Sequence, residues 1–136
     1  MEHLKEYISE ISDFPKGGIL FKDINPIYKD PKIWNEIMLP LQNLITEIRP
    51  DYIAGIESRG FITASALAFN LDIGFITIRK ANKLPGKVIG INYQLEYGKD
   101  RLEVQENLFK KNSKIIVIDD LLATGGTAAA AGKLIG

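Results

Sequence analysis

Apolar positions recur along this chain with the period of a helix in some segments and the period of a strand in others. Near the amino terminus Leu4, Tyr7, Ile8 and Ile11 fall at helical spacing. Residues 3–12 are therefore predicted to form a short amphipathic helix.

A loop and a second helix are predicted next. Residues 13–18 combine a proline with two adjacent glycines, which mark turns. Asp30 and Pro31 have the order of an N-cap followed by proline at the first helical position. Apolar residues keep one helical face from there to Ile48, and Pro40 is expected to kink or split this helix.

Short apolar strands then alternate with helices. Strands are predicted at residues 52–56, 74–79 and 115–118, a tightly packed helix at 60–70, and an alanine-rich helix from about Thr127. This alternation predicts an α/β fold, with a parallel sheet flanked by helices on both faces.

The long segment from residue 81 to residue 113 is polar and charged. Its two alternating stretches, near 88–95 and 101–105, predict a protruding β-hairpin that serves as a lid. Ligands of parallel sheets bind at the carboxyl ends of the strands. Here those ends carry charged or glycine-rich sequence, namely residues 57–60, Arg79-Lys80 and Asp119-Asp120.

The composition of the chain excludes several kinds of functional site. The chain has 136 residues, enough for one domain, and 17 basic residues balance 17 acidic ones, so net charge gives no attraction to nucleic acid or acidic membranes. The absence of cysteine excludes disulfides, thiolate metal sites and a cysteine nucleophile, and the single histidine excludes a histidine-rich metal site. With no spanning apolar run and no signal peptide, we expect a soluble, intracellular protein in the cytoplasm.

The strongest chemical signal follows the apolar strand at 115–118. This strand runs into Asp119 and Asp120, and a loop rich in small residues then leads into the last predicted helix. The loop consists of Ala123, Thr124, Gly125, Gly126 and Thr127. Glycines and a helix N-terminus present backbone N–H groups to an anion, and the two carboxylates beside them suit sugar hydroxyls or Mg²⁺ held through water. The segment therefore predicts a phosphate site.

Two other kinds of nucleotide-binding loop do not fit this segment. A Walker-type nucleotide loop needs a lysine after the final glycine, and none follows Gly126. The glycine pattern of a dinucleotide fold is absent after the first strand. A plain strand–turn–helix with a capping threonine remains the structural alternative, but two adjacent carboxylates after an apolar strand are costly unless they bind something.

The segment 115–127 resembles the phosphoribosyl pyrophosphate signature of type I phosphoribosyltransferases. Further segments resemble the adenine phosphoribosyltransferases in that family's order: 14–24 the adenine-contacting segment, 57–61 the pyrophosphate loop, and 83–86 with 95–99 the flexible catalytic loop. The resemblance implies a single domain over 1–136, in which 1–30 hold the base-binding segment and 81–113 a flexible lid.

The resemblance also implies roles for individual residues. The acid pair would meet the ribose hydroxyls and the loop from Ala123 to Thr127 the 5′-phosphate. Glu96 would be the general acid/base and Tyr97 would seal the closed site. The diphosphate would lie on Ser58, Arg59, Arg79 and Lys83, and the base on Leu20, Phe21 and Lys22. Taken without the resemblance, the sequence favours an ordinary exposed loop glutamate at Glu96, and fits a core phenylalanine at Phe21 or a solvated Lys83 about as well.

The implied reaction forms AMP and pyrophosphate from adenine and phosphoribosyl pyrophosphate. The resemblance also implies Mg²⁺ carried by the sugar diphosphate, and a homodimer. Relatives continue for several dozen residues, so the chain is expected to lack a C-terminal strand and helix and to be weakly stable and poorly active by itself. Two alternatives stay open: transfer to another base such as a 6-oxopurine, and a non-catalytic module that binds the same ligand. A DNA-binding regulator is disfavoured, because no basic DNA-binding element is visible.

Overall fold

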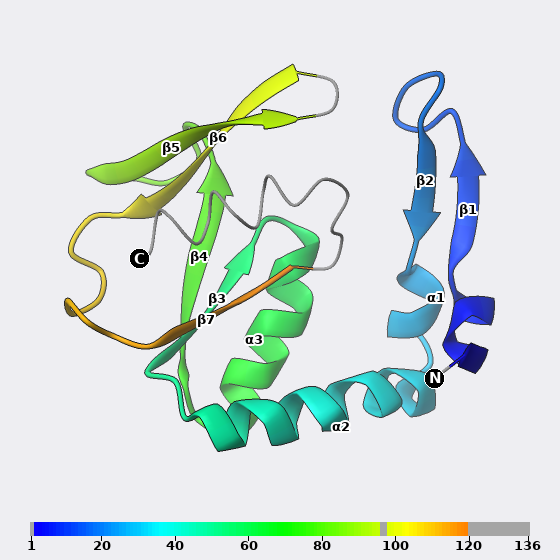
Figure 1. Cartoon of the computed structure of the whole chain (residues 1–136), viewed down its shortest axis with the longest axis horizontal. Helices are drawn as coiled ribbons and strands as arrows, with labels where there is room; N and C mark the ends of the chain where they lie inside the picture. Colours follow the sequence, from blue (N-terminus) through cyan, green and yellow to red (C-terminus); the bar gives the residue numbers. More distant parts are fainter. Residues whose placement is uncertain (1, 96–97, 120–136) are drawn as a thin grey trace. The chain divides into compact units, whose positions relative to one another are not determined.

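The computed structural model describes residues 2–95 and 98–119. The chain divides into two compact units, Met1–Asn43 and Leu44–Gly136, which are described in turn. Figure 1 labels their helices and strands along the chain. Within the described ranges no helix has both the length and the apolar character needed to cross a membrane.

The first unit begins with a 3-10 helix, η1 (Glu2–Tyr7), and a hairpin of β1 (Ser9–Ser12) and β2 (Leu20–Asp23). The predicted helix over 3–12 is therefore wrong in its second half. β1 pairs antiparallel with β2 and places Ile11 opposite Phe21. The backbone hydrogen bonds between β1 and β2 favour a strand more than the weak helical spacing favours a helix. The spacing of residues within 3–12 cannot reveal β2 as a partner.

The loop between β1 and β2 occupies the predicted position. Within it the Phe14–Pro15 peptide bond is cis, and Gly18 has a φ of 84°. The backbone N–H of Gly18 donates to Oδ1 of Asp13 over 2.8 Å. Glycine suits this left-handed position because it has no Cβ.

Two helices complete the first unit, α1 (Asn25–Tyr28) and α2 (Pro31–Ile48), and α2 continues into the second unit. The predicted N-cap is confirmed, since Oδ1 of Asp30 accepts from the N–H of Lys32 at 3.1 Å and of Ile33 at 3.4 Å. Pro40 does not split α2, which runs unbroken through it. Burial of apolar side chains such as Ile33 and Ile45 favours the helix on either side of the proline.

The second unit contains a five-stranded sheet with the order β5-β6-β4-β3-β7. Its strands are β3 (Tyr52–Ile56), β4 (Gly74–Lys80), β5 (Val88–Leu95), β6 (Gly98–Gln105) and β7 (Ile115–Ile118). β3 runs parallel to β4 and β7, as predicted. The sheet is nevertheless mixed, because β6 pairs antiparallel with both β4 and β5 (Figure 1).

The hairpin predicted over 81–113 is confirmed as β5 and β6, but its base is part of the sheet. β6 pairs with β4, which places Glu103 opposite Arg79 and Leu102 opposite Lys80. Leu102 and Val104 join the buried apolar cluster formed by β3 and β4. The base of the β5–β6 hairpin is therefore anchored in the apolar core of the second unit.

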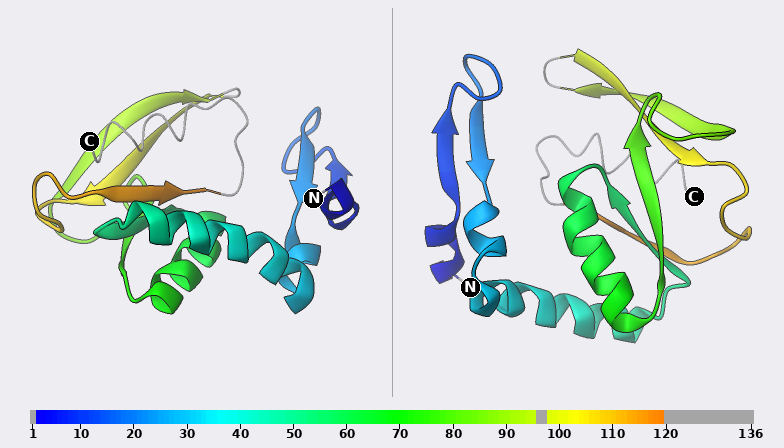
Figure 2. Two further views of the ribbon diagram at one scale, coloured as in Figure 1. Left: turned by 60° about the horizontal axis from the view of Figure 1, so that its bottom comes forward. Right: turned by 180° about the vertical axis from the view of Figure 1, so that it is seen from behind.

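One helix of the second unit, α3 (Arg59–Leu71), lies against β3, β4 and β7 (Figure 2). Gly55 makes the close approach of β3 and α3 possible. A Cβ at Gly55 would lie 2.9 Å from both the Ala64 Cβ and the Gly60 carbonyl oxygen. α3 ends at Asp72, which adopts the left-handed conformation of a helix C-cap.

β7 occupies one edge of the sheet in the part of the chain that the structure describes. Its four residues, Ile115–Ile118, are all half-buried rather than fully buried as predicted for a parallel strand covered on both faces. Among the described residues, β7 has a neighbouring strand on one side only.

Replacing Gly55 by alanine tests the β3–α3 packing. The new methyl group would push against backbone atoms of α3, so we expect the free energy of unfolding to fall by about 1–3 kcal/mol. Gly17→Ala is the matched control, because a Cβ there has no neighbour within 4 Å. Urea unfolding checks both variants, and equal stabilities would contradict the packing described here.

Candidate active site

The carboxyl ends of β3, β4 and β7 lie at one edge of the sheet, which we call the carboxyl edge (Figure 1). The register places Ile56 opposite Ile78, and Gly55 opposite Ile118. The charged segments that follow these strands are therefore neighbours, as the sequence predicts.

Glu57, the first residue after β3, organises this edge. Its side chain is only 9% exposed. Its Oε1 accepts hydrogen bonds from Nε of Arg79 at 3.3 Å and from the backbone N–H of Lys80 at 2.6 Å. Nζ of Lys83 lies 3.7 Å from its Oε2. A nearly buried carboxylate with two cations and a backbone donor is well compensated, so the cations are held in place. We call Glu57, Arg79 and Lys83 the Glu57 cluster.

Arg79 is also held by an aromatic ring. Its guanidinium carbon lies 5.9 Å from the centroid of the Phe61 ring, and that ring packs edge-on against Phe75 at 5.8 Å. A planar guanidinium that meets a carboxylate on one side and a ring on another has few alternative rotamers. The Arg79 side chain remains 33% exposed, which leaves it accessible to an anionic ligand.

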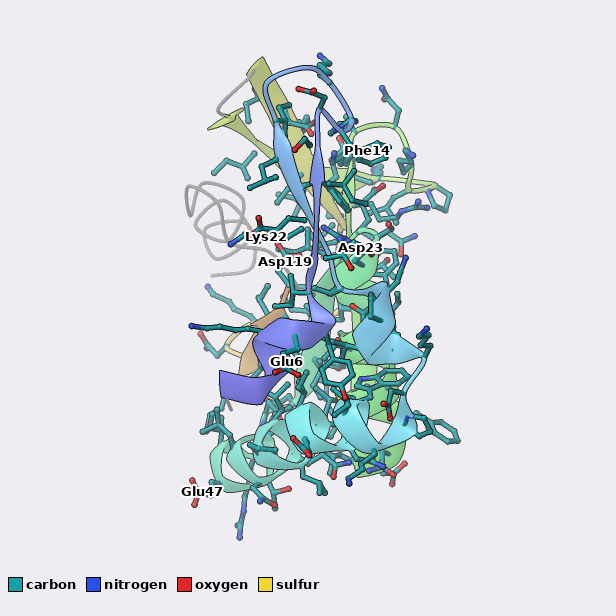
Figure 3. The ribbon with its side chains drawn as sticks, turned by 90° about the vertical axis from the view of Figure 1, so that its right-hand side faces the viewer. Glu6, Phe14, Lys22, Asp23, Glu47 and Asp119 are labelled. Atoms are coloured by element: carbon teal, nitrogen blue, oxygen red, sulfur yellow. The ribbon has the colours of Figure 1, made fainter. Side chains whose placement is uncertain are left out.

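Gly60 brings the loop after β3 into contact with the end of β7. A Cβ at Gly60 would lie 2.8 Å from the carbonyl oxygen of Ile118 and 3.5 Å from Oδ1 of Asp119. Only a residue without a side chain permits this approach. The Asp119 carboxylate therefore lies next to the first turn of α3, and the residue is labelled in Figure 3.

The N-terminus of α3 points into the same edge. Ser58 occupies the N-cap position without a side-chain capping bond, and Arg59 is the first helical residue. The peptide bond between Glu57 and Ser58 is cis. The first turn of a helix has unpaired N–H groups and a partial positive charge, so this end of α3 favours an anion.

A second carboxylate, Glu103 on β6, is buried at the base of the hairpin with 7% of its surface exposed. Its Oε2 accepts from Nε of Arg101 at 2.9 Å, and its Oε1 accepts from the N–H of Asn82 at 3.1 Å. Two hydrogen bonds hold the pKa of Glu103 below its usual range. The bond from Arg101 has the larger effect, and the bond from Asn82 the smaller one. This residue therefore stays charged at neutral pH.

The predicted base-binding residues lie on β2 in the first unit. Phe21 is half-buried, and the ring of Phe14 meets it edge-on at 5.0 Å. Leu20 and Lys22 are exposed, and Figure 3 shows Lys22 and Asp23 on opposite sides of the strand. The ring of Phe21 is thus positioned by a second aromatic side chain.

Comparison with known proteins identifies the family. The model of the phosphoribosyl transferase domain matches residues 23–136. The chain is 73% identical over 135 residues to the adenine phosphoribosyltransferase of Prochlorococcus marinus strain NATL1A, covering 99% of this chain and 78% of that protein. The chain belongs to the adenine phosphoribosyltransferase family.

Solved structures of adenine phosphoribosyltransferases have the same fold. The Rhodothermus marinus enzyme is 40% identical with a TM-score of 0.92, over 98% of this chain and 76% of that one. The Saccharomyces cerevisiae enzyme is 42% identical with a TM-score of 0.86, over 98% and 78%. The yeast structure is a complex with adenine and an imino-altritol bisphosphate. The α/β fold of the family is thus confirmed for this chain.

Several residues predicted from the resemblance lie outside the described residues, and their roles stay predictions. They are Glu96, Tyr97, Asp120, and the predicted phosphate loop made of Ala123, Thr124, Gly125, Gly126 and Thr127. The structure does bring together Ser58, Arg59, Arg79, Lys83 and Asp119 at the carboxyl edge.

Two residues with clear contacts in the structure are not identified by the sequence pattern. The sequence assigns no role to Glu57 within the segment 57–60, although an acidic residue directly after a buried strand needs cationic partners. Phe14 was placed in the base-binding segment without a contact, because only the hairpin shows that its ring reaches Phe21.

Glu57→Gln tests the central contact of this edge. The amide is neutral, so Arg79 and Lys83 lose their counter-charge, and we expect the free energy of unfolding to fall by about 1–2 kcal/mol. Urea unfolding at low salt measures the change. Glu106→Gln is the control, since Glu106 is exposed. Equal losses in both variants would show that Glu57 does not hold these cations.

Proposed function

We propose that this chain transfers the phosphoribosyl group of phosphoribosyl pyrophosphate to adenine and releases AMP and pyrophosphate. The family membership and the yeast relative's complex with adenine support this reaction. The observation that carries the proposal is the contact of Gly60 with the end of β7. This contact brings the loop after β3, which suits the diphosphate, next to the Asp119 carboxylate, which suits the ribose.

The Glu57 cluster supports binding of the diphosphate. Arg79 and Lys83 offer positive charge at the carboxyl edge, and both are held by the same carboxylate. When the bond between the anomeric carbon and pyrophosphate breaks, its electron pair leaves with pyrophosphate. Fixed cations stabilise that growing negative charge without having to reorganise. Arg59 and the first turn of α3 supply further donors.

The ribose and its 5′-phosphate are assigned to the segment after β7. Asp119, with Asp120, would accept hydrogen bonds from the ribose hydroxyls, and the loop from Ala123 to Thr127 would bind the phosphate through backbone N–H groups. The half-buried position of Asp119 beside Gly60 supports the first part of this assignment. It fits a carboxylate that is partly desolvated by its ligand.

Adenine is assigned to β2 and to the lid. The ring of Phe21, braced by Phe14, would stack on the purine, while backbone groups of Leu20 and Lys22 read its edge. Glu96 would take up or deliver the proton of a ring nitrogen while the imidazole-ring nitrogen attacks the anomeric carbon. Tyr97 would help exclude water, which would otherwise hydrolyse the activated sugar.

Magnesium is part of the proposal. No group of three or more His, Cys, Asp or Glu side chains suited to a metal occurs in the described part of the chain. In the proposal Mg²⁺ would arrive on the sugar diphosphate, and Asp119 and Asp120 could contact it through bridging water. Bound there, Mg²⁺ would neutralise charge on the leaving group.

The proposal also includes a homodimer in the cytoplasm. α3 leaves two apolar side chains exposed one heptad apart, Ile62 at 38% and Phe69 at 92%. Such a stripe on the helix that follows the diphosphate loop suits contact with a second copy.

A base-selectivity assay tests the function. The chain is incubated with Mg²⁺, phosphoribosyl pyrophosphate and adenine, hypoxanthine, guanine or xanthine, and the nucleoside monophosphate is measured. We expect adenine to be preferred by at least about a hundredfold, because a base edge that lacks its hydrogen-bond partners is strongly rejected. The comparison between bases does not depend on the absolute rate. Preference for a 6-oxopurine, or binding without any product, would select one of the two alternatives.

A substitution at the carboxyl edge is the companion test. Asp119→Asn should raise KM for phosphoribosyl pyrophosphate roughly 10–100-fold. This is the loss in affinity expected when a hydrogen bond to a charged group becomes one to a neutral group. Asp51→Asn is the control, because Asp51 accepts from the N–H of Lys114 at 2.8 Å and an amide oxygen can also accept. Equal KM values in the two variants would remove Asp119 from the sugar site.

A further inference from the structure

The turn that carries Lys83 is fastened to the hairpin by a contact that the proposed reaction does not use. β4 ends at Lys80, and the chain then turns through Asn82, whose φ is 66°. The N–H of Asn82 donates to Oε1 of Glu103 over 3.1 Å. Lys83, the next residue, reaches Glu57. Glu103 therefore holds the residue directly before a proposed diphosphate ligand.

The position of Glu103 is set by the register of three strands. Glu103 lies opposite Arg79 on β4 and opposite Gly90 on β5. Directly opposed residues of an antiparallel pair point to the same face of the sheet. Glu103 thus shares one face of the sheet with Arg79 of the Glu57 cluster, which lies opposite it on β4, and with Arg101, which lies two residues before it on β6.

Arg101 and Gly90 complete this arrangement. Nε of Arg101 donates to Oε2 of Glu103 over 2.9 Å, so both carboxylate oxygens are used. The guanidinium of Arg101 lies over Gly90, and a Cβ at position 90 would overlap with its atoms. A side chain at position 90 would therefore displace the Arg101 guanidinium from its present position beside Glu103. We call Glu103, Arg101 and Gly90 the Glu103 cluster.

Further bonds tie the same turn to β6. Nε2 of Gln105 donates to the carbonyl oxygen of Pro85 over 3.3 Å, and the N–H of Glu106 donates to the carbonyl of Lys87 over 3.0 Å. These contacts lie farther from Lys83 along the chain than the Asn82 bond does. Of these three contacts between the turn and the hairpin, the one that Glu103 makes is thus the closest to Lys83 along the chain.

We propose that Glu103 is a positioning residue for the transfer reaction: it orients the Asn82–Lys83 turn so that the ammonium group of Lys83 meets the diphosphate. Arg101 and Gly90 act through Glu103, which they hold in a single rotamer. This inference rests on the proposed function for its substrate, but the link from Glu103 to Asn82 does not. It adds a second carboxylate to the site, one that touches no substrate.

The first experiment needs no substrate. Hydrogen exchange of the Asn82 amide is measured by NMR in the wild-type chain, Glu103→Gln and Gly90→Ala, with Glu106→Gln as the control. We expect exchange to accelerate roughly tenfold in both test variants, because each weakens the acceptor of that amide, and to stay unchanged in the control. The acceleration should be confined to the turn. Unchanged exchange at Asn82, or faster exchange throughout the sheet, overturns the positioning role.

The second experiment measures the effect on the reaction. Glu103→Gln should raise KM for phosphoribosyl pyrophosphate roughly tenfold and leave KM for adenine unchanged, since only the diphosphate ligand is displaced. In a Lys83→Ala background the same substitution should have no further effect. Additive losses, or a rise in both KM values, would mean that Glu103 only stabilises the fold. If the wild-type chain makes no AMP, the proposed function fails, and the exchange experiment alone decides the positioning role.

Discussion

A carboxylate that is nearly removed from water has to be matched by positive groups, and Glu57 meets this condition where β3 ends. Its oxygens hold Arg79 and contact Lys83, so one carboxylate positions both cations. The geometry around them follows from a glycine, because Gly60 lets the first turn of α3 approach the end of β7 and Asp119. Charge compensation and close backbone approach together build the carboxyl edge. The catalytic proposal depends on both.

Much of the fold was predictable because local patterns and tertiary packing agree in the second unit. The apolar strands at 52–56 and 115–118 and the helix at 60–70 are short, strongly patterned segments, and the structure has strands and a helix at these positions. The hairpin over 81–113 was predictable for the same reason, since its two alternating stretches become a pair of strands. Likewise, Asp30 before Pro31 is a local capping signal and needs no distant partner.

Other features depend on partners that are distant in sequence. β1 is a strand because it pairs with β2, which the spacing of Ile8 and Ile11 cannot show. α2 passes through Pro40 since its apolar face is buried on both sides of the proline. The contacts of the Glu57 cluster and the burial of Glu103 depend on the alignment of β4 beside β3 and β6. The family resemblance predicts which residues contact ligand, but it does not predict that Glu57 contacts Arg79 and Lys83.

The central claim is that a phosphoribosyl diphosphate binds at the carboxyl edge. NMR mapping of backbone amides during titration with phosphoribosyl pyrophosphate and Mg²⁺ tests it most directly. We predict the largest shifts at residues 58–60, 80–83 and Asp119, and none at residues 110–113, which line a polar hollow beside Asp51 and Tyr52. Shifts centred on residues 110–113, or a carboxyl edge that stays unchanged at saturating ligand, would contradict the account.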